Sequence, residues 1–338
     1  MKHTLIIGAM LVVVSPASGH HSDAGMDMTA VVALEGTITE FNWRNPHVYV
    51  IVETIGADGE AVEWALQMGT ANGLSRRGWT SDSLSSGDRV TVRGHPTQDG
   101  RPYAIVESIE KEGGLALASV AAVPNLSART DTLSGRWLAD RSKLVSYPGG
   151  YDGFFHAQLV LTDKAKAAQA DYDPLSAENP ESTCIGRATP AALVSSSLYL
   201  LEIEINEDNE TVVIRSEYFD EVRTVYMDGR SHPDAGQRLA TGHSIGRWEG
   251  DVLVVDTTNF TDHRSPYQIG VPAGAQKHVV ERYRLTEDGT RIELEFFLED
   301  PEYLAEPMTH ARELVYSPHM QRFQFNCDPE ATSRFLAD

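Results

Sequence analysis

The second half of the chain carries ionisable residues on segments that alternate like β-strands. In residues 278–284, HVVERYR, Glu281 shares one face with Tyr283, and His278 shares the other with Arg282. Only one of these faces can point into a barrel. The interior would therefore contain either Glu281 and Tyr283 or His278 and Arg282. An interior histidine near a carboxylate could work as an acid/base pair. An interior arginine would suit a ligand that bears a carboxylate.

These residues belong to a larger set of polar side chains on neighbouring strand-like segments. The candidate acid/base residues are His232, His243, His278 and Glu281, and the candidate ligand contacts are Arg223, Arg230, Arg282, Tyr283 and Trp248. The set predicts a site for a small, partly apolar ligand, or alternatively a hydrolase, lyase or isomerase that depends on His and Glu. The alternative is that these residues form no site and instead make surface ion pairs or occupy turns, as Asp228 and Asp251 beside glycines would.

Residues 242–260, GHSIGRWEGDVLVVDTTNF, predict one hairpin with a corner at Glu249-Gly250-Asp251. The letters GHSIG match the nucleophile elbow of serine hydrolases, which requires a helix after the serine. Here a turn and a second strand follow, so Ser244 is not taken as a nucleophile. The chain also has no Gly-rich phosphate loop, His-Glu-x-x-His or Cys-x-x-Cys motif.

A second candidate site lies at the start of the expected mature chain. Cleavage after Gly19 would leave His20 with a free α-amine beside its imidazole, followed by His21, and His47 could approach from the first domain. An amine with imidazoles suits Cu(II). The sequence therefore predicts a possible copper site at His20, His21 and His47, and the alternative is a polar tail that binds metal adventitiously.

Composition and targeting signals bound the class of protein. The 338 residues carry a net charge of −21, which argues against nucleic acid and anionic lipid as partners. Lys2, an apolar run at 5–14 and small residues up to Gly19 indicate a cleaved signal peptide at 1–19. We expect a soluble periplasmic or secreted protein without membrane insertion. Cys184 and Cys327 could pair there, or remain two buried thiols.

The pattern of short strands predicts an all-β chain with two barrels. After the signal peptide we expect a flexible His/Met-rich segment at 20–28, an OB-like five-stranded barrel at 29–112, a linker at 113–130 and a lipocalin-like antiparallel barrel at 131–338. Within the last, 154–162 is expected to be a strand and 164–172 a short helix.

Residues 43–47, WRNPH, form a loop of the first domain that has two readings. Pro46 restricts Asn45 to an extended conformation. The loop is then either a ligand contact at the mouth of the barrel or a structural corner in which Asn45 bonds its own backbone.

Two sets of motifs carry a resemblance to known families. WRNPH at 43–47, RRGW at 76–79 and the His20-His21-Ser22 start resemble a family of exported bacterial domains of unknown function. Cys184, RTVYMDGRSHP at 223–233, the 242–260 stretch, HVVERYR and the late Glu299-Asp300-Pro301 resemble a second uncharacterised bacterial family. A Pro-His-Ser-Glu motif of that family is PAGA at 272–275 here. The resemblance implies no established activity.

Overall fold

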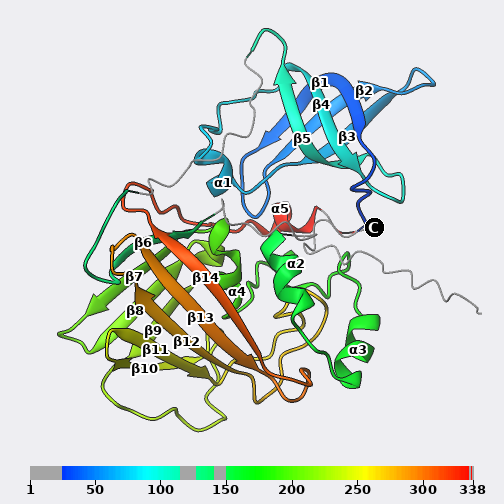
Figure 1. Cartoon of the computed structure of the whole chain (residues 1–338). Helices are drawn as coiled ribbons and strands as arrows, with labels where there is room; N and C mark the ends of the chain where they lie inside the picture. Colours follow the sequence, from blue (N-terminus) through cyan, green and yellow to red (C-terminus); the bar gives the residue numbers. More distant parts are fainter. Residues whose placement is uncertain (1–24, 115–126, 141–149, 335, 337–338) are drawn as a thin grey trace, which may run out of the picture.

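The computed structural model describes residues 25–114, 127–140, 150–334 and 336 of the chain. Within these ranges the protein is mostly β, with a closed five-stranded barrel followed by a closed nine-stranded barrel. Figure 1 shows the smaller barrel above the larger one, with the C-terminal segment passing between them. The expected all-β class with a small barrel before a larger one is confirmed.

The first barrel contains β1 (Val32–Asn42), β2 (Tyr49–Ile55), β3 (Ala61–Gln67), α1 (Ala71–Ser75), β4 (Arg89–Pro96) and β5 (Tyr103–Lys111). Its strand order is β1-β2-β3-β5-β4, with β3 and β5 parallel, which is the OB-like arrangement. Alternate residues of β2 and β4, such as Val50, Val52, Val90 and Val92, fill the core. Gly36 allows the close crossing of β1 over β2, since a Cβ there would lie 2.3 Å from a backbone oxygen.

The second barrel consists of β6 (Gly135–Ala139), β7 (Leu201–Asn206), β8 (Thr211–Ser216), β9 (Val222–Tyr226), β10 (His243–Glu249), β11 (Val252–Thr258), β12 (His278–Leu285), β13 (Arg291–Glu299) and β14 (Met308–Tyr316). Neighbouring strands are antiparallel except for β9 and β10, which pair in parallel and close the barrel. The inward side chains form one apolar core around Trp137, whose indole N–H donates to the Leu133 carbonyl.

The 242–260 hairpin forms as expected. β10 and β11 pair from His243 with Thr258 to Glu249 with Val252. Gly250 at the corner has a φ of 66°, a conformation that favours glycine. Ser244 lies in the middle of β10 and is not at a strand-to-helix turn, in agreement with its rejection as a nucleophile.

Short helices connect the strands of the second barrel: α2 (Gly150–Ala157), α3 (Asp163–Ala170), η3 (Pro180–Thr183), α4 (Ala191–Val194), η4 (Ser195–Ser197) and η5 (Tyr218–Asp220). A last helix, α5 (Pro329–Ser333), follows the final strand. The strand expected at 154–162 is wrong, because the second half of α2 and a turn occupy the start of this range. Phe155 packs from α2 against Phe296 and His310, and this burial outweighs the local β-pattern. No helix in the described ranges is long and apolar enough to cross a membrane.

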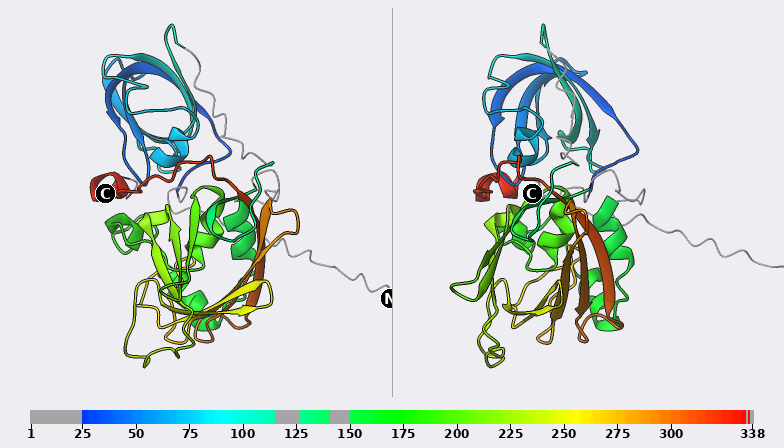
Figure 2. Two further views of the ribbon diagram at one scale, coloured as in Figure 1. Left: turned by 90° about the vertical axis from the view of Figure 1, so that its left-hand side faces the viewer. Right: turned by 60° about the vertical axis from the view of Figure 1, so that its left-hand side comes forward.

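The C-terminal segment joins the two barrels. Figure 2 shows it between them in both views, with α5 beside the first barrel. Cys184, which ends η3, forms a disulfide with Cys327, which precedes α5, so the expected pairing is confirmed. Asn45 in the first barrel forms a backbone bridge with Cys327, and Arg44 forms an ion pair with Asp328. The segment is therefore fixed to both barrels.

Candidate functional site

Three of the sequence-predicted residues meet inside the second barrel. Arg223 on β9 reaches Glu281 on β12 through two parallel contacts, Nη1 to Oε1 at 2.8 Å and Nη2 to Oε2 at 2.7 Å. The Tyr283 hydroxyl donates to Glu281 Oε2 at 2.6 Å. Arg223 is 1% exposed, and the two β12 residues are fully buried. The inward face of β12 is therefore the one with Glu281 and Tyr283.

Two hydroxyl residues of the hairpin complete this interior cluster. Ser244 and Thr257 face each other across β10 and β11, with their hydroxyl oxygens 2.8 Å apart. Arg223 Nη1 donates to Thr257 at 3.1 Å. Sequence reasoning set Ser244 aside, although its register opposite Thr257 was a signal that both hydroxyls face one way. Both Glu281 oxygens accept hydrogen bonds within the cluster, whereas Arg223 Nε is buried without a hydrogen-bond partner among the described residues.

Two ionisable residues that the sequence did not single out lie beside the interior cluster. Lys277 is 2% exposed, and its ammonium lies 4.3 Å from the centre of the Phe260 ring. Burial lowers the pKa of Lys277 to about 8, although Asp300 and Glu221 oppose the shift. Burial likewise raises the pKa of Glu221 to about 7, and nearby Arg223 opposes that shift. Both groups thus have pKa values nearer to neutrality than usual.

The three predicted histidines form a chain on the outer face of the second barrel. Nδ1 of His232 lies 2.9 Å from Nδ1 of His243, and Nε2 of His232 lies 3.1 Å from Asp256 Oδ1. The same Asp256 oxygen is 2.9 Å from His278 Nε2, and His278 Nδ1 is 2.9 Å from Glu299. This histidine chain fixes the 227–242 loop, which contains His232, against β10, β11 and β12.

The electrostatics of the histidine chain are those of ion pairs at a half-buried surface. The hydrogen bond to Asp256, aided by Glu299 and opposed by burial, raises the pKa of His278 to about 9. Burial alone would raise the pKa of Asp256, but its contacts with His278 and His232 bring it below the usual value. Burial lowers the pKa of His243. A protonated His278 is therefore the ordinary state near neutral pH.

The structure does not bring Glu281 and the predicted histidines together. Residues 278 and 281 are an odd number of positions apart on one strand, so they point to opposite faces of the sheet. Glu281 meets Arg223 inside, and His278 meets Asp256 outside. An acid/base pair of histidine and Glu281 in the barrel interior is not what the structure contains.

The other three predicted ligand contacts also lie on the exterior. Arg230 pairs with Asp228 and lies 3.8 Å from the centre of the Tyr226 ring. Arg282 pairs with Glu249 at 2.9 Å, and Trp248 is 46% exposed. Arg230 and Trp248 line none of the cavities described here, whereas Arg282 lines a cavity of about 550 Å³ on the outside of the second barrel, together with Arg284 and Glu293.

The predicted copper ligands do not form a site within the described residues. His20 and His21 lie outside the ranges that the structure describes. His47 lies on the wall of a cavity between the barrels. In residues 25–114, 127–140, 150–334 and 336, no group of three or more His, Cys, Asp or Glu residues is placed to hold a metal ion.

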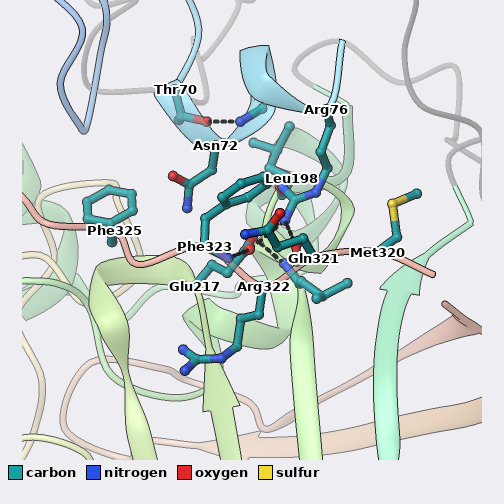
Figure 3. Close-up of polar contacts among 12 residues, drawn as sticks. Thr70, Asn72, Arg76, Leu198, Glu217, Met320, Gln321, Arg322, Phe323 and Phe325 are labelled. Carbon is teal, nitrogen blue, oxygen red and sulfur yellow. Dashed lines mark hydrogen bonds and ion pairs between the residues drawn. The ribbon is translucent and has the colours of Figure 1, made fainter. Parts of the chain in front are cut away.

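A buried ion pair fixes the joint between the barrels. Figure 3 shows Arg76, at the end of α1, reaching Glu217 of the second barrel. Glu217 is fully buried, and it also accepts hydrogen bonds from the backbone N–H groups of Leu200 and Phe323 at 3.0 and 2.6 Å. One carboxylate therefore binds the first barrel, the second barrel and the C-terminal segment together.

The WRNPH loop is a second part of this joint. The Asn45 amide donates to the Phe325 carbonyl at 2.6 Å and to Asn72 at 3.1 Å, and its oxygen accepts from the Ala71 N–H at 2.9 Å. The Asn45–Pro46 peptide bond is cis. The Asn45 side chain thus bonds α1 of its own barrel and the C-terminal segment rather than its own backbone, and neither reading of the loop predicted this.

A cavity of about 250 Å³ lies between the barrels next to this joint. Its wall in the first barrel includes His47, Gln67, Leu74 and Arg77, and its wall in the second includes Glu181, Arg187, Leu198, Tyr199 and Tyr218. Arg187 Nε lies 2.6 Å from Glu181 and 2.8 Å from the Tyr218 hydroxyl, which itself donates to Glu181 at 2.7 Å. The two walls come from distant parts of the sequence, so no local motif could have revealed them.

Comparison with known proteins gives one finding for the first part of the chain. Residues 9–105 match the model of a "Family of unknown function (DUF6152)", which covers less than a third of the sequence. The matched stretch contains β1 to β4 and the start of β5, including the WRNPH loop. No curated protein matches the chain. The first barrel is thus similar to an uncharacterised domain family.

Proposed function

We propose that this is an exported binding protein that holds a small, partly apolar molecule in the cavity between its two barrels. The observation that carries the proposal is the cavity itself. Its volume of about 250 Å³ exceeds the roughly 150 Å³ that holds a benzene molecule in an engineered apolar cavity. Ligand sites also occur preferentially at domain interfaces. The cavity therefore has room for one compact organic molecule.

The lining of the cavity supports an amphipathic ligand. Leu74, Leu198 and Phe219 offer apolar surface, while Arg187 and Gln67 offer hydrogen-bonding groups. A wall that is mostly apolar with a few placed polar groups is typical of small-molecule sites. This combination is more typical of a ligand site than of a packing defect between two domains.

The interior cluster of the second barrel supports a site at the end of the barrel rather than within it. Arg223 and Glu281 form a bidentate ion pair that is almost completely buried, and a polar ligand inside the barrel would have to break it. Val255 and Phe296, which lie opposite Glu281 on the two neighbouring strands, and Leu253, opposite Tyr283, are exposed by 1% or less. The site expected from the sequence in the barrel is therefore proposed at its end, against the first barrel.

Two features support the proposal of export to the periplasm or beyond. The sequence at 1–19 has the pattern of a cleaved signal peptide. The Cys184–Cys327 disulfide is of a kind that persists in oxidising compartments.

Saturation-transfer NMR on the mature protein tests the binding proposal with three probes: phenol, benzamide and sodium benzoate. We expect saturable binding of at least one probe, and its loss in Val106→Trp, because Val106 lines the cavity and indole would fill it. Val222→Trp is the matched control, since Val222 is 53% exposed and lies outside the cavity lining. Failure of all three probes, or equal binding to Val106→Trp, would refute the proposal.

A further inference from the structure

We infer that the molecule held between the barrels is a small carboxylate with an apolar body about the size of a benzene ring. This inference rests on the proposed function and names the class of ligand. It follows from the charge of the cavity wall, from one arginine on that wall and from the space beside it.

The cavity wall is locally positive although the protein as a whole is strongly negative. Arg77 and Arg187 line the cavity, and Glu181 is the acidic residue among the lining side chains. The Glu181 carboxylate is already engaged by Arg187 and by the Tyr218 hydroxyl. The chain carries a net charge of −21, so a wall with an excess of cations differs from the rest of the surface. Such a wall selects an anion over a cation.

Arg77 is the residue that the fold leaves for the ligand. Its neighbour Arg76 is committed to Glu217 across the joint. The guanidinium of Arg77 makes no hydrogen bond, ion pair or ring contact with any part of the chain that the structure describes, yet it lines the cavity. A guanidinium offers two parallel N–H donors that match a carboxylate. Of the two arginines of the RRGW motif, Arg76 thus holds the barrels together, and Arg77 remains available to bind a ligand.

A further hydrogen-bonding group on the wall suits the same ligand. The Gln67 side-chain oxygen accepts hydrogen bonds from the hydroxyls of Tyr49 and Tyr103. With the oxygen held in this way, the amide N–H₂ of Gln67 remains the group that can donate to an acceptor in the cavity. A carboxylate could therefore accept from Arg77 and Gln67 together.

Size and apolar lining define the rest of the ligand. Beside the polar groups, the cavity is lined by the apolar side chains of Leu74, Ile105, Leu198 and Phe219. A benzene ring needs roughly 150 Å³, and the cavity has about 250 Å³. The remainder accommodates a carboxylate but not a second ring. Aromatic or branched aliphatic monocarboxylates fit these limits.

Isothermal titration calorimetry of the mature full-length protein with sodium benzoate and with benzamide tests the inference. The two probes have nearly the same shape and differ in charge. We expect benzoate to bind at least tenfold more tightly than benzamide, because the amide lacks the charge that Arg77 would pair. In Arg77→Gln the preference should disappear, and in Arg77→Lys part of it should remain. Arg93→Gln is the control, since Arg93 is 55% exposed on β4 away from the cavity.

The outcomes separate this inference from the proposed function. Equal binding of the two probes, or a benzoate preference that persists in Arg77→Gln, would overturn the carboxylate class while the cavity remained a ligand site. Absence of binding by both probes and by phenol would overturn the proposed function and this inference with it. A benzoate preference lost in Arg77→Gln but kept in Arg93→Gln would support both.

Discussion

Removing the charge of Glu281 tests how the interior of the second barrel is held together. Glu281 is fully buried and pairs through both oxygens with Arg223, which is 1% exposed. In Glu281→Gln the guanidinium would stay buried without its counter-charge, which typically costs about 3–5 kcal/mol. For a domain of this size each kcal/mol shifts Tm by roughly 2–4 °C, so we expect Tm to fall by about 6–20 °C.

The double variant Arg223→Met, Glu281→Leu separates the cost of an unpaired charge from the value of the pair. Buried ion pairs replaced by well-packed apolar residues are often neutral in stability. We therefore expect the double variant to unfold within about 2 kcal/mol of the wild type, although each single change is severe. Urea titration with tryptophan fluorescence measures this, because Trp137 is fully buried in the same core. Benzoate binding should survive, since neither residue lines the cavity.

Two results would refute this reasoning. A loss of less than about 1 kcal/mol in Glu281→Gln would mean that the charge of Glu281 does not balance Arg223. A double variant as unstable as the single variants would mean that the partner hydroxyls of Thr257 and Tyr283 depend on the charged pair. In that case the whole polar network, rather than the ion pair alone, specifies the interior.

Two further predictions concern the disulfide and the histidine chain. The Cys184–Cys327 bond joins residues 143 positions apart, so the double variant Cys184→Ala, Cys327→Ala should lose about 2–5 kcal/mol of unfolding free energy. If proteases cleave this variant near α5 no faster than they cleave the wild type, the bond does not hold the C-terminal segment in place. The pKa of His278, raised to about 9 by Asp256 and Glu299 against the opposing effect of burial, makes its stabilising contribution complete below about pH 6.5 and lost as pH rises through about 9. Urea titrations should therefore show His278→Gln less stable than the wild type by about 1–2 kcal/mol at pH 6 and equal to it at pH 10. If the difference in unfolding free energy between the two proteins is the same at both pH values, the ion pair of His278 does not contribute to stability.

The sequence could predict the strands of both barrels but not which face of β12 is inside. A period of two gives two faces with equal regularity, and each face of β12 carries ionisable residues. The choice depends on Arg223, which lies 58 positions from Glu281 and meets it only when the barrel closes. Likewise Asp256 is the centre of the histidine chain only because β11, which carries it, pairs with both β10 and β12.

The joint and its cavity were beyond prediction for a related reason. Asn45 and Phe325 are 280 positions apart, and Arg76 and Glu217 are 141 apart. Such contacts leave no periodic trace in either segment. The motifs did point to special residues, since WRNPH and RRGW both supply groups to the joint. The motifs did not show what these residues contact, because a loop that docks on another domain and a loop that binds a ligand use the same residue types.

The polarity of the joint has a consequence for the cavity beside it. A buried carboxylate such as Glu217 is tolerated only when its hydrogen bonds are made, and here they come from Arg76, Leu200 and Phe323 on three separate parts of the chain. Any sliding of the first barrel over the second would break the contact of Arg76 with Glu217 and leave part of that buried carboxylate unpaired. The cavity walls are thus held in place before a ligand arrives, so binding need not order them. A change that frees the C-terminal segment should therefore weaken benzoate binding even though it leaves every wall residue intact.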